Sequence, residues 1–499
     1  MREKKTDPER PILLPFQPGI VSNGEFVPPH PTEAHLRIAA LAMESATEIA
    51  RRKQIDRRRF LLGVGGLAVT LSAINLVACG DGKSKPGGTY TVTPDGDIEA
   101  ACQVLEGEDF IFDVQTHHIN ATTPAGQAFE GFLRATHPGC ADEHLYECAS
   151  RYGYLKDIFL DSDTTVAVLS DTPSPDDNSD PLSFAEMRRT REIMDTLSSG
   201  GAGRLFLHSI VVPNVGTLQA QLDLMQARAE SMDVAAWKVY TPYQGTTGSG
   251  WYLDDEDLGI PLIEKAIDLG VKRICAHKGL PLFGFDPEYA SPRDFGVVAA
   301  AYPDMQFVAY HSGWDPMNAG AEGPYNPDDA QGVDRLIKSM EDNGVEPNSN
   351  IWAELGYTWR GVMSDPTQAA HVIGKLLKHV GEDRVIWGTD CIWTGSPQPQ
   401  IAAFRAFQID DALAQEHGYP TLTPDVKAKI FGLNAASLYG IDADARRCAI
   451  QTDEVEQFRG AYRNMDATED RRWTANAPIS RRDVLAYFKA NGGAWSPWR

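Results

Sequence analysis

Four side chains that can bind a divalent metal, or move a proton beside one, end short apolar runs of this sequence. They are His117 after FIFDVQT, His277 in KRICAH, His311 in MQFVAYH and Asp390 in RVIWGTD. Imidazole and carboxylate groups suit zinc, which lowers the pKa of bound water to about 7. We therefore expect His117, His277 and Asp390 to hold one divalent ion, zinc first and manganese second. We expect His311 to orient or protonate the substrate.

The stretch FIFDVQTHHIN (110–120) raises a question about its first polar residue. Gln115 lies two residues before His117, where a His-x-His pair would have its first imidazole. A neutral amide oxygen is a weaker metal donor, so three interpretations stay open: a fourth ligand, a donor behind the ligands, or the mark of a specialised site. His118 is predicted to lie behind the site or in a loop.

Three more polar residues occur near the ends of apolar runs: His208, Lys238 and Glu354. His208 lies inside its run, which favours a satisfied core histidine. Lys238 is predicted to bind a substrate anion, with a carbamylated, metal-bridging lysine as the alternative. Glu354 either replaces a missing charge at the metal or pairs with Lys238.

Aromatic residues are frequent in the segments that follow four of the apolar runs, which suggests an apolar or aromatic substrate. Trp314 is expected to contact that substrate, and Arg360 to bind a substrate carboxylate. The aromatic residues are Tyr240, Tyr243, Trp251, Trp314, Tyr357, Trp359 and Trp393.

Eight apolar runs alternate with helical patterns across the middle of the chain, and this alternation predicts an α/β fold. Eight parallel strands suit a (β/α)8 TIM barrel, in which the C-terminal strand ends converge on the active site. A doubly wound sheet is the alternative, but no Gly-x-Gly-x-x-Gly follows the first run. The predicted strands are 110–116, 165–170, 204–212, 235–241, 272–277, 305–311, 350–355 and 384–390.

The composition indicates a globular protein with a small-molecule partner. Of 499 residues, 42% are hydrophobic and 23% charged, and 46 basic against 69 acidic residues give a net charge of −23. This charge disfavours nucleic acid or an anionic membrane surface as the main partner.

The segment DRRRFLLGVGGLAVTLSAINLVAC (56–79) resembles an export signal. Arg57 and Arg58, followed by Phe60 and Leu61, resemble the twin-arginine motif, and the apolar run ends in a lipobox-like LVAC with Cys79 as the acylated residue. A membrane-spanning helix is the alternative, weakened by polar residues and glycines. We expect export to the periplasm, with any membrane contact made through this signal or a lipid on Cys79.

The predicted organisation is an N-terminal extension (1–55), the signal (56–79), a linker (80–109), a barrel (110–445) and a C-terminal helical extension (446–499) that caps the barrel or forms an oligomer contact. Cys140 and Cys148 are candidates for a disulfide. Cys275 and Cys391 lie in apolar strand contexts and are expected to be buried thiols.

The ordered motifs FDVQTHH, RICAHKG, YPDMQFVAYHSGW and GEDRVIWGTD, followed by KIFGLNAASLYGI, resemble the amidohydrolase-related family over about residues 110–442. In that family the first strand ends Asp-x-His-x-His, and Gln115 departs from the pattern. The resemblance implies that His117 and His277 bind metal, that His311 polarises the substrate or shuttles a proton, and that Asp390 binds metal and acts as acid and base.

The leading functional hypothesis is a metal-dependent hydrolase in which activated water attacks a carbonyl or related bond. The family also supports non-oxidative decarboxylation or hydration on the same scaffold, which is the alternative. A third hypothesis is an exported, non-catalytic binding protein whose metal site degenerated through Gln115.

Overall fold

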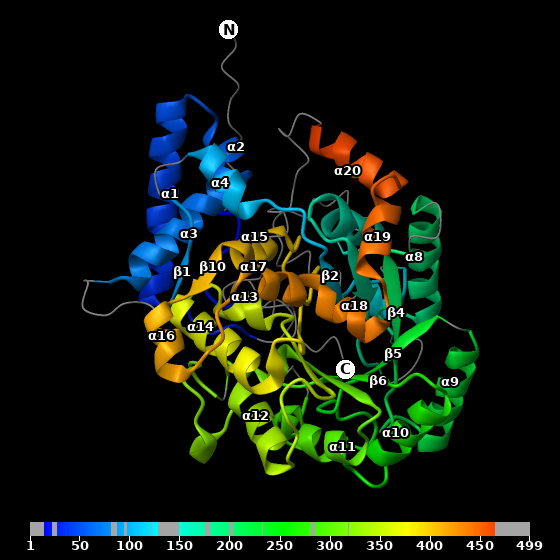
Figure 1. Cartoon of the computed structure of the whole chain (residues 1–499). Helices are drawn as coiled ribbons and strands as arrows, with labels where there is room; N and C mark the ends of the chain where they lie inside the picture. The colour runs from blue at the N-terminus through cyan, green and yellow to red at the C-terminus, as the bar shows by residue number, and fades with distance from the viewer. Residues whose placement is uncertain are drawn as a thin grey trace, which may run out of the picture.

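A closed barrel of eight parallel strands forms the centre of the molecule (Figure 1). The computed structural model describes residues 14–21, 27–80, 87–93, 97–120, 122–127, 149–174, 180–198, 203–231, 233–280, 285–317 and 319–464. The strands follow one another around the barrel in chain order: β2 Phe112–Thr116, β3 Val166–Leu169, β4 Leu205–Ile210, β5 Val234–Val239, β6 Arg273–His277, β7 Gln306–Tyr310, β8 Ile351–Glu354 and β9 Val385–Ile386.

Backbone contacts between β2 and the segment directly after β9 complete the barrel. The Val114 amide donates to the Trp387 carbonyl at 3.1 Å, and Thr116 forms a parallel bridge with Cys391. The sequential strand order and this closure confirm the predicted (β/α)8 class and are inconsistent with an open doubly wound sheet. Each predicted run contains one strand, although β9 is only two residues long.

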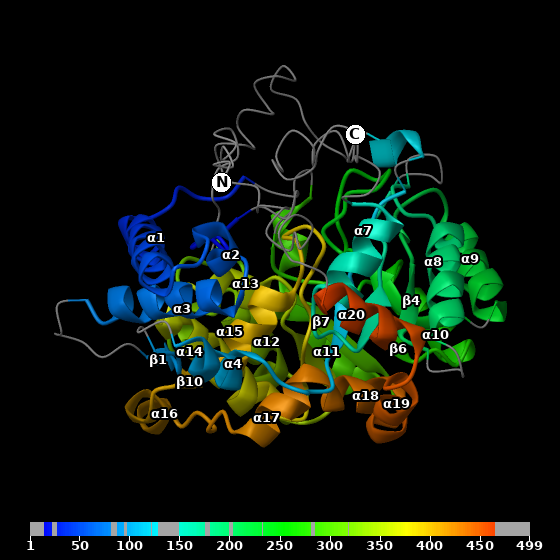
Figure 2. The same cartoon turned by 90° about the horizontal axis from the view of Figure 1, so that it is seen from above.

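Helices surround the barrel, as Figures 1 and 2 show. Their apolar faces pack against strands that are themselves buried, the pattern expected of a parallel sheet. The principal helices are α8 Phe184–Leu197, α9 Leu218–Glu230, α10 Gly259–Asp268, α11 Phe295–Ala301, α12 Val333–Asp342, α13 Thr358–Val362, α14 Pro366–Lys375, α15 Gln398–Ala406, α16 Asp411–His417, α17 Pro424–Ala428 and α18 Asn434–Tyr439.

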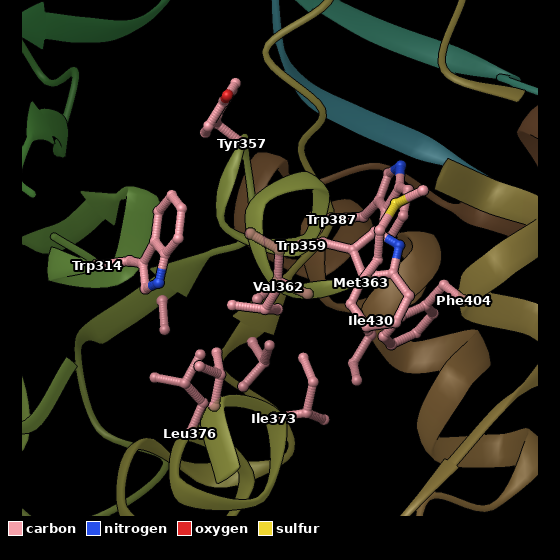
Figure 3. Packing of buried hydrophobic residues seen from close by; sticks show 14 of the residues in the cluster. Trp314, Tyr357, Trp359, Val362, Met363, Ile373, Leu376, Trp387, Phe404 and Ile430 are labelled. Carbon is pink, nitrogen blue, oxygen red and sulfur yellow. The ribbon is translucent and has the colours of Figure 1, made fainter. Parts of the chain in front are cut away.

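Tightly packed aromatic side chains join the last strand to the helices outside it. Trp359 of α13 and Trp387 after β9 both contact Phe404 of α15, with ring centroids 5.0 and 5.3 Å away. Figure 3 shows these rings together with Ile430, while Tyr357 lies apart from them. Burial of such large rings fixes α13 and α15 against the barrel wall.

The N-terminal helices are folded onto the outside of the barrel (Figure 1). They are α1 Glu33–Lys53, α2 Arg57–Leu61, α3 Val64–Ala78 and α4 Ile98–Leu105, and α3 packs against α1, α4, α14 and α15. The predicted signal thus coincides with α2 and α3. Cys79 is exposed at the end of α3, and within the described ranges no helix is both long enough and apolar enough to cross a membrane.

The segment predicted as a linker (80–109) differs from an extended tether wherever the structure describes it. Strand β1 Gly88–Tyr90 pairs antiparallel with β10 Phe407–Ile409. The Asn75 side chain bonds both backbone groups of Tyr90, at 2.7 Å to its carbonyl and 2.9 Å from its amide. These contacts attach the segment to α3 and to the barrel helices.

The C-terminal extension begins with two helices, α19 Ala443–Ile450 and α20 Glu454–Asn464. A fully buried Arg204, next to β4, pairs with Asp453 at 2.7 Å and with Glu456 at 3.0 Å. The segment predicted as a helical extension is helical where the structure describes it, up to residue 464, and its remainder lies outside the described residues.

The structure also bears on the cysteines. Cys275 and Cys391 are fully buried free thiols, as predicted. Cys140 and Cys148 lie outside the described residues, so their pairing stays a prediction.

Helix α3 offers a test of whether the predicted signal is part of the folded domain. Leu71 is 0% exposed and Leu76 is 55% exposed on the same helix. We expect Leu71→Ala to lower the free energy of unfolding by about 2–5 kcal/mol, and Leu76→Ala by less than about 0.5 kcal/mol, in denaturant titrations. Equal effects of the two substitutions would show that α3 does not pack as described.

Candidate active site

The four residues predicted to carry the chemistry lie at the C-terminal ends of their strands and are almost completely buried. His117, His277, His311 and Asp390 are each no more than 2% exposed. Because all eight strands run parallel, the strand order brings these ends to one mouth of the barrel.

His117 and Asp390 form one pair of this site. The Nδ1 atom of His117 lies 2.8 Å from the Ser170 carbonyl, and its Nε2 atom lies 3.1 Å from Asp390 Oδ1. The ring stacks on Trp393, with centroids 5.5 Å apart. The Ser170 carbonyl can only accept, so Nδ1 carries the proton and Nε2 faces the carboxylate.

His277 and His311 form the second pair. The Nδ1 atom of His277 lies 3.2 Å from Nε2 of His311. The outer nitrogens each donate to a carbonyl, His277 Nε2 to Leu280 at 2.9 Å and His311 Nδ1 to Gly356 at 2.7 Å. Burial, together with the Lys238 ammonium, lowers the pKa of His277 to about 3. Burial and the His277 ring lower the pKa of His311 well below its usual value, so both rings are neutral.

These tautomers leave acceptor atoms facing one another. Two neutral imidazoles at 3.2 Å present lone pairs to each other, and a proton or a cation between them would relieve the repulsion. Ligand atoms held about 2.0–2.1 Å from one tetrahedral zinc ion are about 3.3 Å apart, close to the separation within each pair. Metal-bound histidines also generally donate their second N–H to a carbonyl or carboxylate. The donor chemistry therefore fits a divalent metal.

The predicted ligands His117, His277 and Asp390 are nevertheless arranged as parts of two pairs. Among the described residues, no three His, Cys, Asp or Glu side chains are close enough together to hold an ion as they stand. The cause is local: the Ser170 carbonyl orients His117 toward Asp390, while the Leu280 carbonyl orients His277 toward His311. The two pairs still interact, because the Asp390 carboxylate acts to raise the pKa of His311.

Gln115 is a hydrogen-bond donor to Asp390 in this arrangement. Its Nε2 atom lies 2.9 Å from Asp390 Oδ1, whereas its Oε1 atom is buried and has no hydrogen-bond partner among the residues that the structure describes. Of the three interpretations of Gln115, this geometry matches the donor that lies behind the ligands.

Asp113 is a site residue that the sequence analysis did not single out. Its carboxylate accepts from the Thr389 amide at 3.1 Å and from the Thr389 hydroxyl, and so fixes the backbone just before Asp390. Burial raises the pKa of Asp113 to about 7. Its position in the Asp-x-Gln-x-His stretch was the available signal.

Glu354, at the end of β8, holds the backbone of His311. Its Oε2 accepts from the His311 amide at 3.0 Å, and its Oε1 accepts from the Gly356 amide. Burial raises the pKa of Glu354 to about 8, although these hydrogen bonds and the Lys238 ammonium act to lower it. A Cβ atom at Gly388 would overlap Oε1, so this glycine makes room for the carboxylate.

Non-glycine residues at the mouth adopt left-handed backbone conformations. The φ angles are 63° at His311, 51° at Ser312, 57° at Tyr357 and 58° at Asp390. Such conformations cost about 1–3 kcal/mol each, and they cluster at functional sites where the surroundings hold them. Their coincidence with the strand ends supports a functional role for this mouth.

The three predicted substrate-binding residues are buried in other contacts. Lys238 lies over the rings of Tyr310 and Tyr240, 3.3 and 4.8 Å from their centroids. Trp314 is 2% exposed and packs against Tyr357, with centroids 6.0 Å apart. Arg360 donates to backbone carbonyls of the N-terminal segment, as described below.

His208 and His118, the other two histidines considered in the sequence, form hydrogen bonds within the core. His208 is completely buried and lies 2.8 Å from the Tyr439 hydroxyl, in agreement with the predicted core position. His118 bonds Thr190 Oγ1 at 2.9 Å and lies behind the site.

Comparison with known proteins supports the family suggested by the motifs. An amidohydrolase family model matches residues 211–441, which include His277, His311 and Asp390. The chain is 23% identical to L-fucono-1,5-lactonase of Burkholderia ambifaria over 312 residues, 60% of this chain and 95% of that protein. The chain is therefore similar to the amidohydrolase family over residues 211–441 and to one lactonase at low identity.

Two solved structures resemble the chain at low identity. The TIM-barrel protein Bb4693 of Bordetella bronchiseptica is 16% identical, with 68% of this chain and 99% of that chain covered and a TM-score of 0.41. The 2,6-dihydroxybenzoate decarboxylase of Rhizobium is 14% identical, with 66% and 99% covered and a TM-score of 0.39.

Gly388 allows a test of the Glu354 contact. In Gly388→Ala the new methyl group displaces the Glu354 carboxylate, and we expect the free energy of unfolding to fall by about 1–3 kcal/mol. Hydrogen exchange at the His311 amide should accelerate, because that amide loses its acceptor. Gly323→Ala is the control, since nothing lies within 4 Å of its Cβ position. An unaltered His311 amide in Gly388→Ala would contradict this geometry.

Proposed function

We propose that this chain is a metal-dependent hydrolase that attacks a carbonyl or related bond of a small apolar or aromatic substrate. One observation carries the proposal: His117 Nε2 faces Asp390 Oδ1 at 3.1 Å and His277 Nδ1 faces His311 Nε2 at 3.2 Å, all at one barrel mouth. These are the donor types that a divalent ion requires. The residues that would hold it are His117, His277 and Asp390, with zinc the first choice and manganese the second.

When bound, the metal would polarise the carbonyl and lower the pKa of a water molecule. Asp390 would accept a proton from the attacking water and return it to the leaving oxygen as the carbonyl–oxygen bond breaks. Gln115 would keep the carboxylate in place through its amide hydrogen bond at 2.9 Å. The buried mouth would exclude bulk water and so strengthen these interactions.

The geometry suggests a different role for His311 from the predicted one. Donation to the substrate from Nε2 would require a doubly protonated ring, because Nδ1 already donates to the Gly356 carbonyl. Burial and the His277 ring hold its pKa well below the usual value and oppose that charge. We therefore assign His311 Nε2 as a hydrogen-bond acceptor or a fourth metal ligand.

Small-molecule specificity is part of the proposal. Trp314 lies beside the mouth, and the similarity to a lactonase favours a cyclic or linear ester as the substrate type. Lys238 and Arg360 would serve an anionic substrate group. The net charge of −23 gives no support to a nucleic-acid partner.

Decarboxylation or hydration remains the alternative reaction, and a non-catalytic binding protein the third hypothesis. The same pairs would then hold a substrate's oxygen atoms while a proton is delivered to carbon. In the third case, the unpartnered Oε1 of Gln115 would mark a lost ligand position.

The reaction type is tested by turnover in ¹⁸O-labelled water. We expect a sugar 1,5-lactone or an aryl ester to yield product with one ¹⁸O atom, and a hydroxybenzoic acid to release no carbon dioxide. Asp390→Asn should lower kcat by about 10²–10⁴, because it removes the proton acceptor. The control is Asp328→Asn, an exposed carboxylate outside the site.

Carbon dioxide release without ¹⁸O incorporation would contradict hydrolysis and support decarboxylation. An Asp390→Asn variant with unchanged kcat would contradict the mechanism. If the wild type is inactive and Gln115→His gains turnover, the third hypothesis is correct.

We also propose that the chain is exported to the periplasm by the twin-arginine route and anchored through Cys79. The proposal rests on Arg57 and Arg58 ahead of the apolar helix α3 and on the exposure of Cys79 at its end. The double substitution Arg57→Lys with Arg58→Lys should retain the full chain inside the cell, as measured by fractionation. Arg51→Lys with Arg52→Lys is the matched control. Equal export of both variants would reject this route.

A further inference from the structure

A short N-terminal segment, Leu14–Val21, lies against the loop that follows β8 although it forms neither helix nor strand. We call it the strap. Leu14, Phe16 and Val21 are no more than 5% exposed. The burial of three apolar side chains indicates that this irregular segment packs at one defined position on the protein.

Three strap carbonyls accept hydrogen bonds from two side chains of the segment after β8: Tyr357, just before α13, and Arg360 of α13. Arg360 donates from Nη2 to the Gln17 carbonyl at 2.8 Å and from Nη1 to the Gly19 carbonyl at 3.1 Å. The Tyr357 hydroxyl donates to the Val21 carbonyl. The strap thereby presents two oxygen acceptors to the two terminal nitrogens of one guanidinium.

Arg360 is a cation without a carboxylate partner among the described residues. It is 2% exposed, and its charge is opposed by burial, which lowers its pKa. The two terminal nitrogens of a guanidinium match the two oxygens of a carboxylate, which can accept from both at once. The two strap carbonyls are therefore neutral substitutes for the ligand that this guanidinium suits best.

Tyr357 and Arg360 belong to the same short segment as two residues that contact His311. The Gly356 carbonyl accepts from His311 Nδ1 at 2.7 Å, and Thr358 Oγ1 donates to the His311 carbonyl at 2.8 Å. Tyr357 and Arg360 lie within four residues of these contacts. A carboxylate bound by Arg360 would thus be placed next to the barrel mouth.

We infer that the strap is an intramolecular cover of a carboxylate-binding fork formed by Arg360 and Tyr357, and that its displacement admits a carboxylate-bearing ligand to the mouth. The inference rests on the proposed function for the identity of the mouth, and it concerns the full chain before any processing at Cys79. Carboxylate binding by Arg360 and Tyr357 requires neither metal nor turnover. An experiment can therefore reject this inference without rejecting the proposed hydrolase function, and the reverse.

Gly19 gives a way to loosen the strap without touching the fork. Its φ is +90°, and a Cβ atom there would lie 2.6 Å from His35 Nδ1 of α1, so Gly19→Val strains the strap and pushes it outward. The matched control is Gly270→Val, with a φ of +72° and nothing within 4 Å of its Cβ position. Hydrogen exchange of the strap amides reports whether the strap has loosened.

The probe is benzoate, with the neutral amide benzamide as its control, titrated calorimetrically into the full chain. We expect the strap amides of Gly19→Val to exchange faster and benzoate to bind at least about tenfold more tightly than to the wild type. Benzamide affinity should not change, and Gly270→Val should behave as the wild type. Arg360→Gln added to Gly19→Val should abolish the gain.

Faster strap exchange with unchanged benzoate affinity would overturn the inference, and so would a gain that survives Arg360→Gln. If Gly19→Val does not fold, Phe16→Ala loosens the strap by removing its buried ring. Strap exchange that neither variant accelerates would mean that these contacts do not hold the strap, which also contradicts the inference. A benzoate gain in a protein that neither binds metal nor turns over ester would reject only the proposed function.

Discussion

Each of the three site imidazoles donates one N–H to a backbone carbonyl, and the chemistry of the barrel mouth depends on these three hydrogen bonds. The acceptors are Ser170 after β3, Leu280 after β6 and Gly356 after β8. Each bond fixes a tautomer and aims the other nitrogen inward. The closed strand order matters because it brings these loops to one end of the barrel.

Three further buried side chains hold the site residues in position through hydrogen bonds. Asp113 holds the backbone before Asp390, Gln115 holds its carboxylate, and Glu354 holds the backbone of His311. The left-handed φ angles at His311 and Asp390 are the local cost of this placement, and the buried hydrogen bonds sustain it. Gln115 therefore has a structural explanation that does not require it to touch a metal.

The barrel and its strand-end residues were predictable from the sequence. Strands buried on both faces produce short apolar runs, and the polar residue that ends such a run marks the mouth. His117, His277, His311 and Asp390 were found in this way, and His208 was correctly placed in the core. Asp113 could have been included, because it belongs to the same first-strand motif.

The remaining features arise from contacts between distant segments, which leave no periodic signal. Arg360 bonds carbonyls of Gln17 and Gly19, and Tyr90 bonds Asn75 across the segment predicted as a linker. The separation of the ligands into two pairs depends on loop carbonyls, and any residue type supplies a carbonyl. Sequence patterns therefore located the polar groups at the strand ends but not their orientation.

We propose that these inward-facing nitrogens and Asp390 form a site for a divalent metal ion. The most direct measurement is the metal content and the zinc and manganese affinity of protein purified without chelator, compared with His117→Ala, His277→Ala and the control His371→Ala, a buried histidine outside the site. We expect about one ion per chain in the wild type and in His371→Ala, and loss of that ion in the two site variants. A wild type that binds no ion, or site variants that keep it, would contradict such a site.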